Sequence, residues 1–430
     1  MSSLIESVRG RRVWDSRGRP TVEAEITLAG GSTGRAIAPA GASTGSAEAV
    51  DRRDGGVAFG GYDVQGALAA VNGEIAGLLR GRDACDQAAL DAALVDLDGT
   101  PNKARLGGNA IVATSMALAH AAAAAQGLPL WRYLGAGRDD FFLPLPEVQI
   151  FGGGAHAGRR VDVQDFMVIA VGAADYAQAL EWTAEVYRAA GQLMQEAGLL
   201  AGVADEGGWW PAFDSNEQAL DFLLRAIERA GYTPGQDVAI SLDIAATDFG
   251  RGGQYTLARD GRRIDSDGLA EMLLGWLARY PVVAIEDPLA EDDGEGLRRF
   301  TAAAGPKVEV VADDFICTNA GRIGRGATVG ACNTALIKPN QAGTLSETRA
   351  ALDAARAAGW ESIVSARSGE TEDVSIVHLA VGWGVKQLKV GSFARSERMA
   401  KWNEGLRLAE ALGQGGGRLA AQDSFPWGRT

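Results

Sequence analysis

The stretch Val311-Ala312-Asp313-Asp314, followed by Ala335-Leu336-Ile337-Lys338, decides the fold class. Both are short apolar runs that end abruptly on a charged residue. Between helical patterns, such a run is typical of a strand that is buried on both faces of a parallel sheet. The same pattern recurs at residues 238–243 and 282–287, and more weakly at residues 362–367 and 387–389.

Each run brings one charged residue to the carboxyl end of a candidate strand. The intervals between these residues are 22 to 43 residues long, and one βα unit fits in each. In a closed βα barrel all such strand ends meet on one face, where the active site lies. Three carboxylates and three cations in one small volume indicate that a metal ion and an anionic ligand share the site. The six residues are Asp243, Glu286, Asp313, Lys338, Arg367 and Lys389.

Length and composition limit the class of protein. With 430 residues the chain is long enough for two domains, one of them the size of a barrel. A net charge of −14, with no basic stripe, argues against nucleic acid as a partner. Three cysteines that are far apart favour a reduced, cytoplasmic protein over a disulfide framework. Residues 1–30 lack the order of charged and apolar segments that a signal peptide has.

The hydrophobic pattern changes along the chain. Residues 11–38 alternate, with Gly30-Gly31 at a hairpin turn, whereas residues 65–134 have helical periodicity. From Leu143 onward we expect strands and helices to alternate to the end. We therefore predict an N-terminal α+β cap domain and a C-terminal α/β domain that is a βα barrel. The apolar run 116–125 is too short to span a membrane and predicts a buried helix. The two predicted domains are residues 1–138 and 139–430.

Several short motifs, in one order over nearly the whole chain, resemble the enolases (phosphopyruvate hydratases). Any one motif is weak evidence, but so many in one order are highly specific. The resemblance implies a small α+β cap on a modified eight-stranded βα (TIM-like) barrel, in agreement with the pattern above. The matching stretches are Asp15-Ser16-Arg17-Gly18, Gly41-Ala42-Ser43-Thr44-Gly45, Asp205-Glu206-Gly207-Gly208, Ile285-Glu286-Asp287-Pro288, Ile337-Lys338-Pro339-Asn340-Gln341 and Arg367-Ser368-Gly369-Glu370.

The resemblance implies magnesium chemistry. Asp243, Glu286 and Asp313 would bind a first Mg²⁺, for which hard carboxylate oxygens are suited. Ser43, in a loop between two glycines, would reach a second Mg²⁺ when that loop closes. Lys338 would be the base that removes the proton next to the substrate carboxylate, and the two ions would stabilise the enolate. Taken alone, an acidic residue at a strand end is more often a turn or helix-cap residue.

The same resemblance assigns the substrate contacts. Lys389 would hold the substrate carboxylate, while Arg367 and Ser368 would bind phosphate, for which a planar guanidinium fork is suited. Glu206 would assist departure of the hydroxyl group as a general acid, and Asp165 belongs to the same acid machinery. The remaining substrate-binding residues are His156 and Gln164.

Two departures from the enolase pattern fall in the acid machinery. Enolases carry Ser-His-Arg-Ser where this chain has a methyl group at Ala366, so a histidine lining the site is missing. They also carry a glutamate where this chain has Asp165. The shorter side chain draws the carboxylate back by about 1 Å, and misplacement on that scale costs about 10²-fold in rate. Smaller changes lie at Ala40, Gly152, Ala155 and Trp209-Trp210, of which the tryptophans are equally compatible with core filling.

These departures favour a specialised relative over the glycolytic enzyme. We expect Mg²⁺-dependent formation of an enolate from 2-phosphoglycerate, phosphoenolpyruvate or a close phosphono analogue. The carboxyphosphonoenolpyruvate synthases of phosphonate (phosphinothricin-type) pathways are relatives of this kind. Two alternatives stay open: an ordinary enolase in which His156 compensates, and a catalytically silent structural or binding protein. We expect a cytoplasmic homo-oligomer, a dimer or an octamer, that acts on a small three-carbon acid without nucleic acid or membrane.

Overall fold

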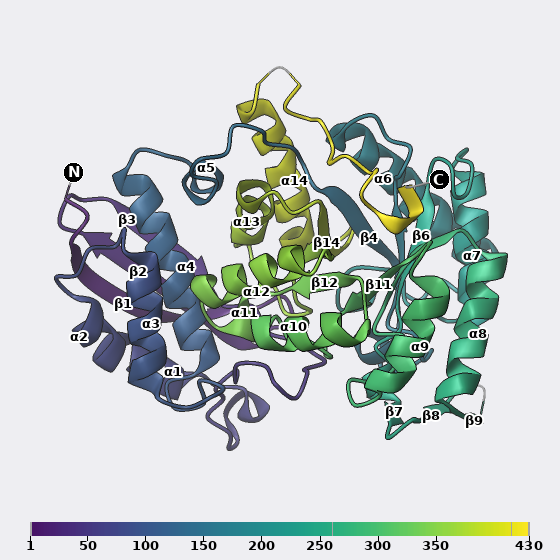
Figure 1. The fold of residues 1–430 in the computed structure, drawn as a ribbon, viewed down its shortest axis with the longest axis horizontal. Coiled ribbons are helices and arrows are strands. Elements are labelled where there is room, and N and C mark those ends of the chain that lie inside the picture. The colour runs from purple at the N-terminus through teal and green to yellow at the C-terminus, as the bar shows by residue number, and fades with distance from the viewer. Residues whose placement is uncertain (1, 260, 414, 429–430) are drawn as a thin grey trace.

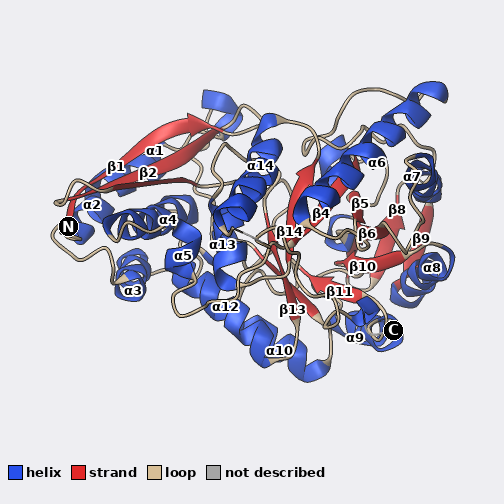
Figure 2. Cartoon of the chain, turned by 90° about the horizontal axis from the view of Figure 1, so that it is seen from above, coloured by secondary structure: helices blue, strands red, loops and turns tan. Residues whose placement is uncertain are grey.

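The chain forms a cap and a closed barrel that lie side by side (Figure 1). The computed structural model describes residues 2–259, 261–413 and 415–428. In the cap, a three-stranded sheet is covered on one face by helices. The barrel has eight strands, and its helices lie on the outside (Figure 2). This architecture confirms the predicted fold class.

The cap begins with an antiparallel sheet in the order β1-β2-β3, formed by Ile5–Trp14, Pro20–Leu28 and Thr33–Ile37. Gly31 lies in the turn between β2 and β3 with a φ of 85°, a conformation that favours glycine. The predicted hairpin is therefore confirmed. The helical segments of the cap are η1 (Ala58–Gly61), α1 (Gln65–Ala70), η2 (Val71–Ile75), α2 (Ala76–Leu79), α3 (Gln87–Asp98), α4 (Gly108–Ala125) and α5 (Leu130–Leu134).

Helix α4 forms the core of the cap. Its small alanine side chains let it approach β2 and β3 closely, and most of its residues are buried. Among the described residues, α4 is the one helix that is long and apolar enough to cross a membrane, with a mean hydropathy of 1.2. Because 83% of that window is buried inside the protein, the helix has the character of a core helix.

We expect Gly34→Ala to destabilise the cap. A Cβ atom at Gly34 would lie 2.1 Å from the Ala121 nitrogen and 2.3 Å from the Ala117 oxygen, both of them backbone atoms of α4. Overpacking of this kind costs about 1–3 kcal/mol, which urea unfolding measures as a lower midpoint. Gly275→Ala is the matched control, because Gly275 lies within α8 and a Cβ atom there has no neighbour within 4 Å among the described residues. That change should raise stability slightly, and an equal loss in both variants would contradict the packing argument.

The barrel closes in the order β10-β11-β12-β13-β14-β4-β5-β6. The expectation that strands and helices alternate from Leu143 onward is wrong at its start. β4 (Leu145–Gly152) pairs with β5 (Asp165–Ile169) in the antiparallel direction, and two helices follow. The connection between these strands holds only the short turn η3 (Gly154–Ala157) instead of the crossover helix that a parallel pair requires. The chain therefore reverses direction.

β5 also pairs with β6 in the antiparallel direction, and the barrel strands from β6 to β14 are parallel, as expected. The remaining barrel strands are β6 (Ala239–Asp243), β10 (Val282–Glu286), β11 (Glu309–Ala312), β12 (Thr334–Ile337), β13 (Glu361–Ser365) and β14 (Gln387–Ser392). The helices are α6 (Tyr176–Glu196), α7 (Asn216–Arg229), α8 (Ser266–Arg279), α9 (Gly294–Ala304), α10 (Ala320–Val329), α11 (Pro339–Ala342), α12 (Leu345–Ala357), α13 (Ser375–Trp383) and α14 (Ser396–Ala411). The domain also contains a small three-stranded sheet and two short helical turns. The sheet is formed by β7 (Gly250–Arg251), β8 (Gln254–Leu257) and β9 (Arg262–Asp265), and the turns are η4 (Ala246–Asp248) and η5 (Pro426–Gly428).

Strand register brings the predicted carboxylates together. Glu286 of β10 pairs with Asp243 of β6 on one side and with Val311 of β11 on the other. Asp313 follows Val311 by two residues and therefore faces the same side of the sheet. The position of Lys389 differs from the prediction. It lies within β14 rather than at its end, because the following residues continue to pair with β4.

Candidate active site

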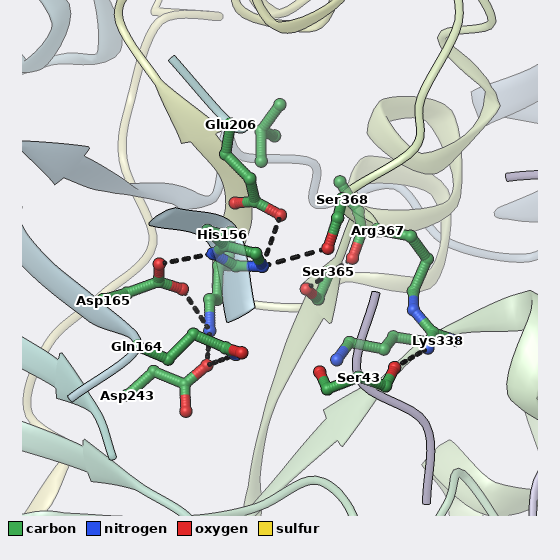
Figure 3. Close-up of a pocket in the computed structure, with 13 residues that line it drawn as sticks. Ser43, His156, Gln164, Asp165, Glu206, Asp243, Lys338, Ser365, Arg367 and Ser368 are labelled. Atoms are coloured by element: carbon green, nitrogen blue, oxygen red, sulfur yellow. Dashed lines mark hydrogen bonds and ion pairs between the residues drawn. The ribbon is translucent and has the colours of Figure 1, made fainter. Parts of the chain in front are cut away.

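The charged residues surround a narrow cavity at the carboxyl ends of the barrel strands (Figure 3). Of the predicted site residues, all line this cavity except Glu286 and Asp313, each of which contacts a lining lysine. The free volume is about 20 Å³. Such a volume holds about one water molecule, so the side chains themselves fill most of the site.

A lysine lies between two of the predicted metal ligands. The Lys389 ammonium group is 2.8 Å from Asp243 Oδ2 and 2.6 Å from Glu286 Oε2. Burial, reinforced by the charge of Asp243, raises the pKa of Glu286 well above its ordinary value. Burial opposes the charged form of Lys389 as well, but the two carboxylates outweigh it and raise the pKa of the lysine. The strand ends therefore form a site that favours additional positive charge.

The predicted base is paired with the third predicted ligand. Lys338 Nζ is 2.5 Å from Asp313 Oδ2, and Gln341 Nε2 donates to Asp313 Oδ1 at 2.8 Å. Burial lowers the pKa of Lys338, but the Asp313 charge outweighs it, and the net shift is upward. A lysine in this pair holds its proton until the carboxylate is engaged elsewhere.

The carboxylates fit a hard divalent cation. Asp243, Glu286 and Asp313 are almost fully buried, and they extend from three neighbouring strands with oxygen ligands only. The described residues contain two groups of three possible ligands whose atoms lie within 4.8 Å of one another. The expected trio is not one of them, and a lysine ammonium group lies against each of its three carboxylates. The two groups are His156–Asp165–Glu206 and Asp287–Asp313–Asp314.

The predicted phosphate ligand Arg367 contacts the cap. It donates to Glu48 Oε2 at 2.8 Å and Oε1 at 3.2 Å, and to the carbonyl oxygen of Ser43 at 2.9 Å. A Cβ atom at Gly41 would lie 2.0 Å from the same guanidinium group, so glycine is needed there. The prediction did not include Glu48, although it lies three residues after the Gly41–Gly45 motif that holds Ser43. The contact closes the cap loop over the cavity.

The departures at Asp165 and Ala366 both line the cavity, and Asp165 contacts His156. Asp165 Oδ1 accepts a hydrogen bond from Gln149 Nε2 at 2.5 Å and lies 3.0 Å from His156 Nδ1. Ala366 lines the same cavity as Ser368, whose hydroxyl group lies 2.9 Å from His156 Nε2. The carboxylate of Asp165 is therefore engaged by its neighbours instead of extending freely into the cavity. The remaining predicted residue, Gln164, donates to Asp243 Oδ2 at 3.0 Å.

Gln149 is a functional residue that the sequence prediction missed. It lies in β4 and is fully buried, and its Oε1 accepts the backbone N–H of Gly208 at 2.9 Å. It thereby links Asp165 to the loop that carries Glu206. The available signal was the alternation of polar Glu147 and Gln149 with apolar residues in an otherwise buried strand.

Two further contacts hold the loops of the site in place. Trp209 stacks on Tyr187 of α6 with ring centroids 4.7 Å apart, and the Tyr187 hydroxyl group donates to Gly207 O at 2.9 Å. Arg398 of α14 is fully buried and donates to the carbonyl oxygens of Arg367 at 2.7 Å and Ser368 at 2.5 Å. Trp209 thus supports the loop next to Glu206, and Arg398 supports the predicted phosphate ligands.

Comparison with protein-family models gives two matches, one for each domain. Residues 5–134 match the model described as the enolase N-terminal domain. Residues 140–424 match the model described as the enolase C-terminal TIM barrel domain. Together the two matches include every residue that lines the cavity.

Proposed function

The chain belongs to the enolase family, and on that premise we propose that it is a Mg²⁺-dependent enzyme that forms an enolate from 2-phosphoglycerate, phosphoenolpyruvate or a close phosphono analogue. One observation carries the proposal. The residues expected to remove the proton and to stabilise charge lie at or against one cavity, whereas the residues expected to serve the leaving group, Asp165 and Glu206, lie against His156. The finer proposal is a specialised relative, such as a carboxyphosphonoenolpyruvate synthase.

Lys338 has the position and chemistry of the base. Its amine would take the proton from the substrate carbon next to the carboxylate, once Asp313 no longer holds the ammonium form. Mg²⁺, held by Asp243, Glu286 and Asp313 and, for a second ion, by Ser43, would stabilise the negative charge that develops on the substrate carboxylate. Because the free volume is small, a three-carbon substrate must replace the internal carboxylates as partner of the cationic side chains.

The residues expected to bind the phosphate group of the substrate support the proposal of a specialised relative. Arg367 and Ser368 would bind a phosphate or phosphonate group, and Ala366 presents a methyl group beside them. A methyl group in place of an imidazole leaves room for a bulkier substituent on that phosphorus. The alternative is an ordinary enolase. It is favoured by one observation, the position of His156 between two carboxylates, where its imidazole can act in place of the missing histidine.

With 2-phosphoglycerate and Mg²⁺ in D₂O, we expect exchange of the C2 proton to be faster than formation of phosphoenolpyruvate by about 10²-fold. Exchange requires only Lys338 and the charge-stabilising groups, whereas dehydration also requires the acid groups, in which Asp165 and Ala366 depart from the enolase pattern. NMR follows the exchange, and absorbance follows the enol product, in the same sample.

The double variant Ala366→His/Asp165→Glu distinguishes a specialised relative from an ordinary enolase. In a specialised enzyme it should raise dehydration at least about tenfold, because it restores the groups that serve the leaving hydroxyl. In an ordinary enolase, dehydration keeps pace with exchange in the wild type and the double variant changes little. Absence of both signals, together with absence of Mg²⁺-dependent ligand binding, would instead support the silent binding protein.

A further inference from the structure

A second and larger cavity lies beside the loop that carries Ser43. Its volume is about 400 Å³, compared with about 20 Å³ for the cavity in the barrel. Its lining residues belong to the cap, except for Asn340, which lies in α11 of the barrel domain. The barrel cavity holds about one water molecule, which is less than a phosphorylated three-carbon acid needs. The neighbouring space therefore bears on which ligands the site can accept.

Arg367 lies between the two cavities. Its side chain lines the barrel cavity (Figure 3), and its Nη1 donates to Glu48 Oε2 at 2.8 Å and to Asn340 Oδ1 at 3.2 Å. Both of these acceptors belong to residues that line the larger cavity. Gly41 also lines the larger cavity, and it contacts the guanidinium group so closely that a side chain has no room there. A phosphorus group held by Arg367 would therefore lie one side chain away from the larger cavity.

We infer that the larger cavity binds an uncharged polar group that the substrate carries on its phosphorus, in addition to the three-carbon acid. The inference rests on the proposed function, because it takes Arg367 as the ligand of that phosphorus. It adds a further part to the substrate, which is then a phosphate or phosphonate with a hydroxyl- or amide-bearing substituent.

The charges around the larger cavity do not suit an ionised substituent. All of its lining residues belong to the described part of the chain, and the charged ones are Glu48 and Asp51. Each of these carboxylates is paired with an arginine, Glu48 with Arg367 at 2.8 Å and Asp51 with Arg53 at 2.6 Å. An anionic substituent would find no basic side chain in the lining, and a cationic one would find carboxylates that are already neutralised. Because an unpaired ion is costly to remove from water, the group that fits is uncharged.

The lining offers hydrogen bonds to such a group. The side-chain amide of Asn102 and the hydroxyl group of Thr44 have no partner among the residues that the structure describes. The Nδ2 group of Asn340 has none there either, although its Oδ1 accepts from Arg367. Two amides and a hydroxyl group supply donors and acceptors without charge. A hydroxyl or amide substituent would pair with them, whereas an apolar one would displace their water and leave them unpaired.

The test compares phosphate ligands that differ only in polarity. Propyl phosphate and glycerol 1-phosphate have the same three-carbon chain, and the second carries two hydroxyl groups. With Mg²⁺ in excess, we expect glycerol 1-phosphate to bind about tenfold more tightly than propyl phosphate, measured by titration calorimetry. Inorganic phosphate reports the contribution of Arg367 without a substituent. Equal affinity for the two esters, or tighter binding of propyl phosphate, would overturn the inference.

Two substitutions of Asn102 locate the preference. Asn102 is exposed, so a tryptophan there is expected to occupy the cavity without disturbing the core. In Asn102→Trp the preference for glycerol 1-phosphate should fall below about twofold, while inorganic phosphate and phosphoenolpyruvate bind within about twofold of wild type. Asn102→Ala, which removes the amide and leaves the space, should lower the preference by about threefold. A preference that survives both substitutions would overturn the inference.

Asn403→Trp is the matched control. Asn403 is also exposed, but it lies on α14 and is not among the residues that line either cavity. This variant should keep the full preference of the wild type. An equal loss in Asn403→Trp and Asn102→Trp would show a general effect of the added tryptophan and would also count against the inference.

A crystal structure of the Mg²⁺ complex with glycerol 1-phosphate gives the position directly. We expect the phosphorus at Arg367 and the hydroxyl groups within hydrogen-bond distance of Asn102 or Asn340. Hydroxyl groups inside the barrel cavity would overturn the inference. That result leaves the proposed function standing, provided that the wild type exchanges the C2 proton of 2-phosphoglycerate. Absence of that exchange overturns the proposed function and, with it, the assignment of the bound group to a substrate.

Discussion

Replacement of Lys338 by alanine is expected to lower C2 proton exchange from 2-phosphoglycerate by about 10²- to 10⁴-fold. Lys338 lines the cavity at the end of β12, and exchange cannot begin without a base beside the carbon. The loss should appear in exchange and dehydration alike, because both follow removal of the same proton. Deuterium incorporation at C2, measured by NMR with Mg²⁺ in excess, gives the rate.

Lys386→Ala is the matched control for this change. Lys386 precedes β14 and pairs with Glu361 at 3.0 Å, at the amino-terminal end of the strands. Its removal should leave exchange unchanged. If Lys338→Ala kept most of the exchange rate while remaining folded, another group would have to be the base, and the assignment of the site would be wrong.

Glu286→Gln is expected to weaken Mg²⁺ binding by about 10²-fold or more, because a hard divalent ion loses a charged oxygen ligand. Asp313→Asn should do the same and should also release Lys338 from its ion pair. Mg²⁺ that binds only the folded protein at 100 times its Kd adds about 2.7 kcal/mol of stability. The midpoint of thermal unfolding, measured over a Mg²⁺ titration and after EDTA treatment, therefore reports the affinity.

Glu309→Gln provides the corresponding control. Glu309 is also a buried carboxyl group of the barrel, and burial raises its pKa to about 8. It accepts hydrogen bonds from Gln387 and Trp427 instead of facing the cavity. Whatever its effect on the stability of the free protein, the shift in unfolding midpoint produced by Mg²⁺ should equal that of the wild type. If Mg²⁺ raised the unfolding midpoint of Glu286→Gln as much as that of the wild type, the three carboxylates would not be the metal site.

The sequence predicted the barrel strands correctly where a strand can be recognised from its own residues alone. A strand buried on both faces must be apolar along its length, so the runs before Asp243, Glu286 and Asp313 were visible in the sequence. The prediction was wrong between β4 and β5. Whether β5 runs parallel or antiparallel to β4 depends on the length of the connection between them, which the apolar pattern of the strands does not reveal. Lys389 was misplaced for a similar reason, because the end of β14 is set by its pairing with β4.

The site was predictable in its residue types but not in its pairings. Arg367 could be recognised as a ligand for an anion, yet its partner Glu48 is 319 residues away in sequence. Gln149 gave a weak signal, and nothing in the sequence connected it with Asp165. Such contacts depend on which side chains the closed barrel and the cap bring within hydrogen-bond distance.

The amino-acid sequence by itself determined which residues end the strands and therefore which charges gather on one face of the barrel. Only the tertiary structure decided how those charges are paired. In a buried cavity each charge must be compensated nearby, and the compensating group is whichever one the packing places there. In this protein, the packing places Asp165 in contact with His156 and Gln149, and it places Asp313 in contact with Lys338.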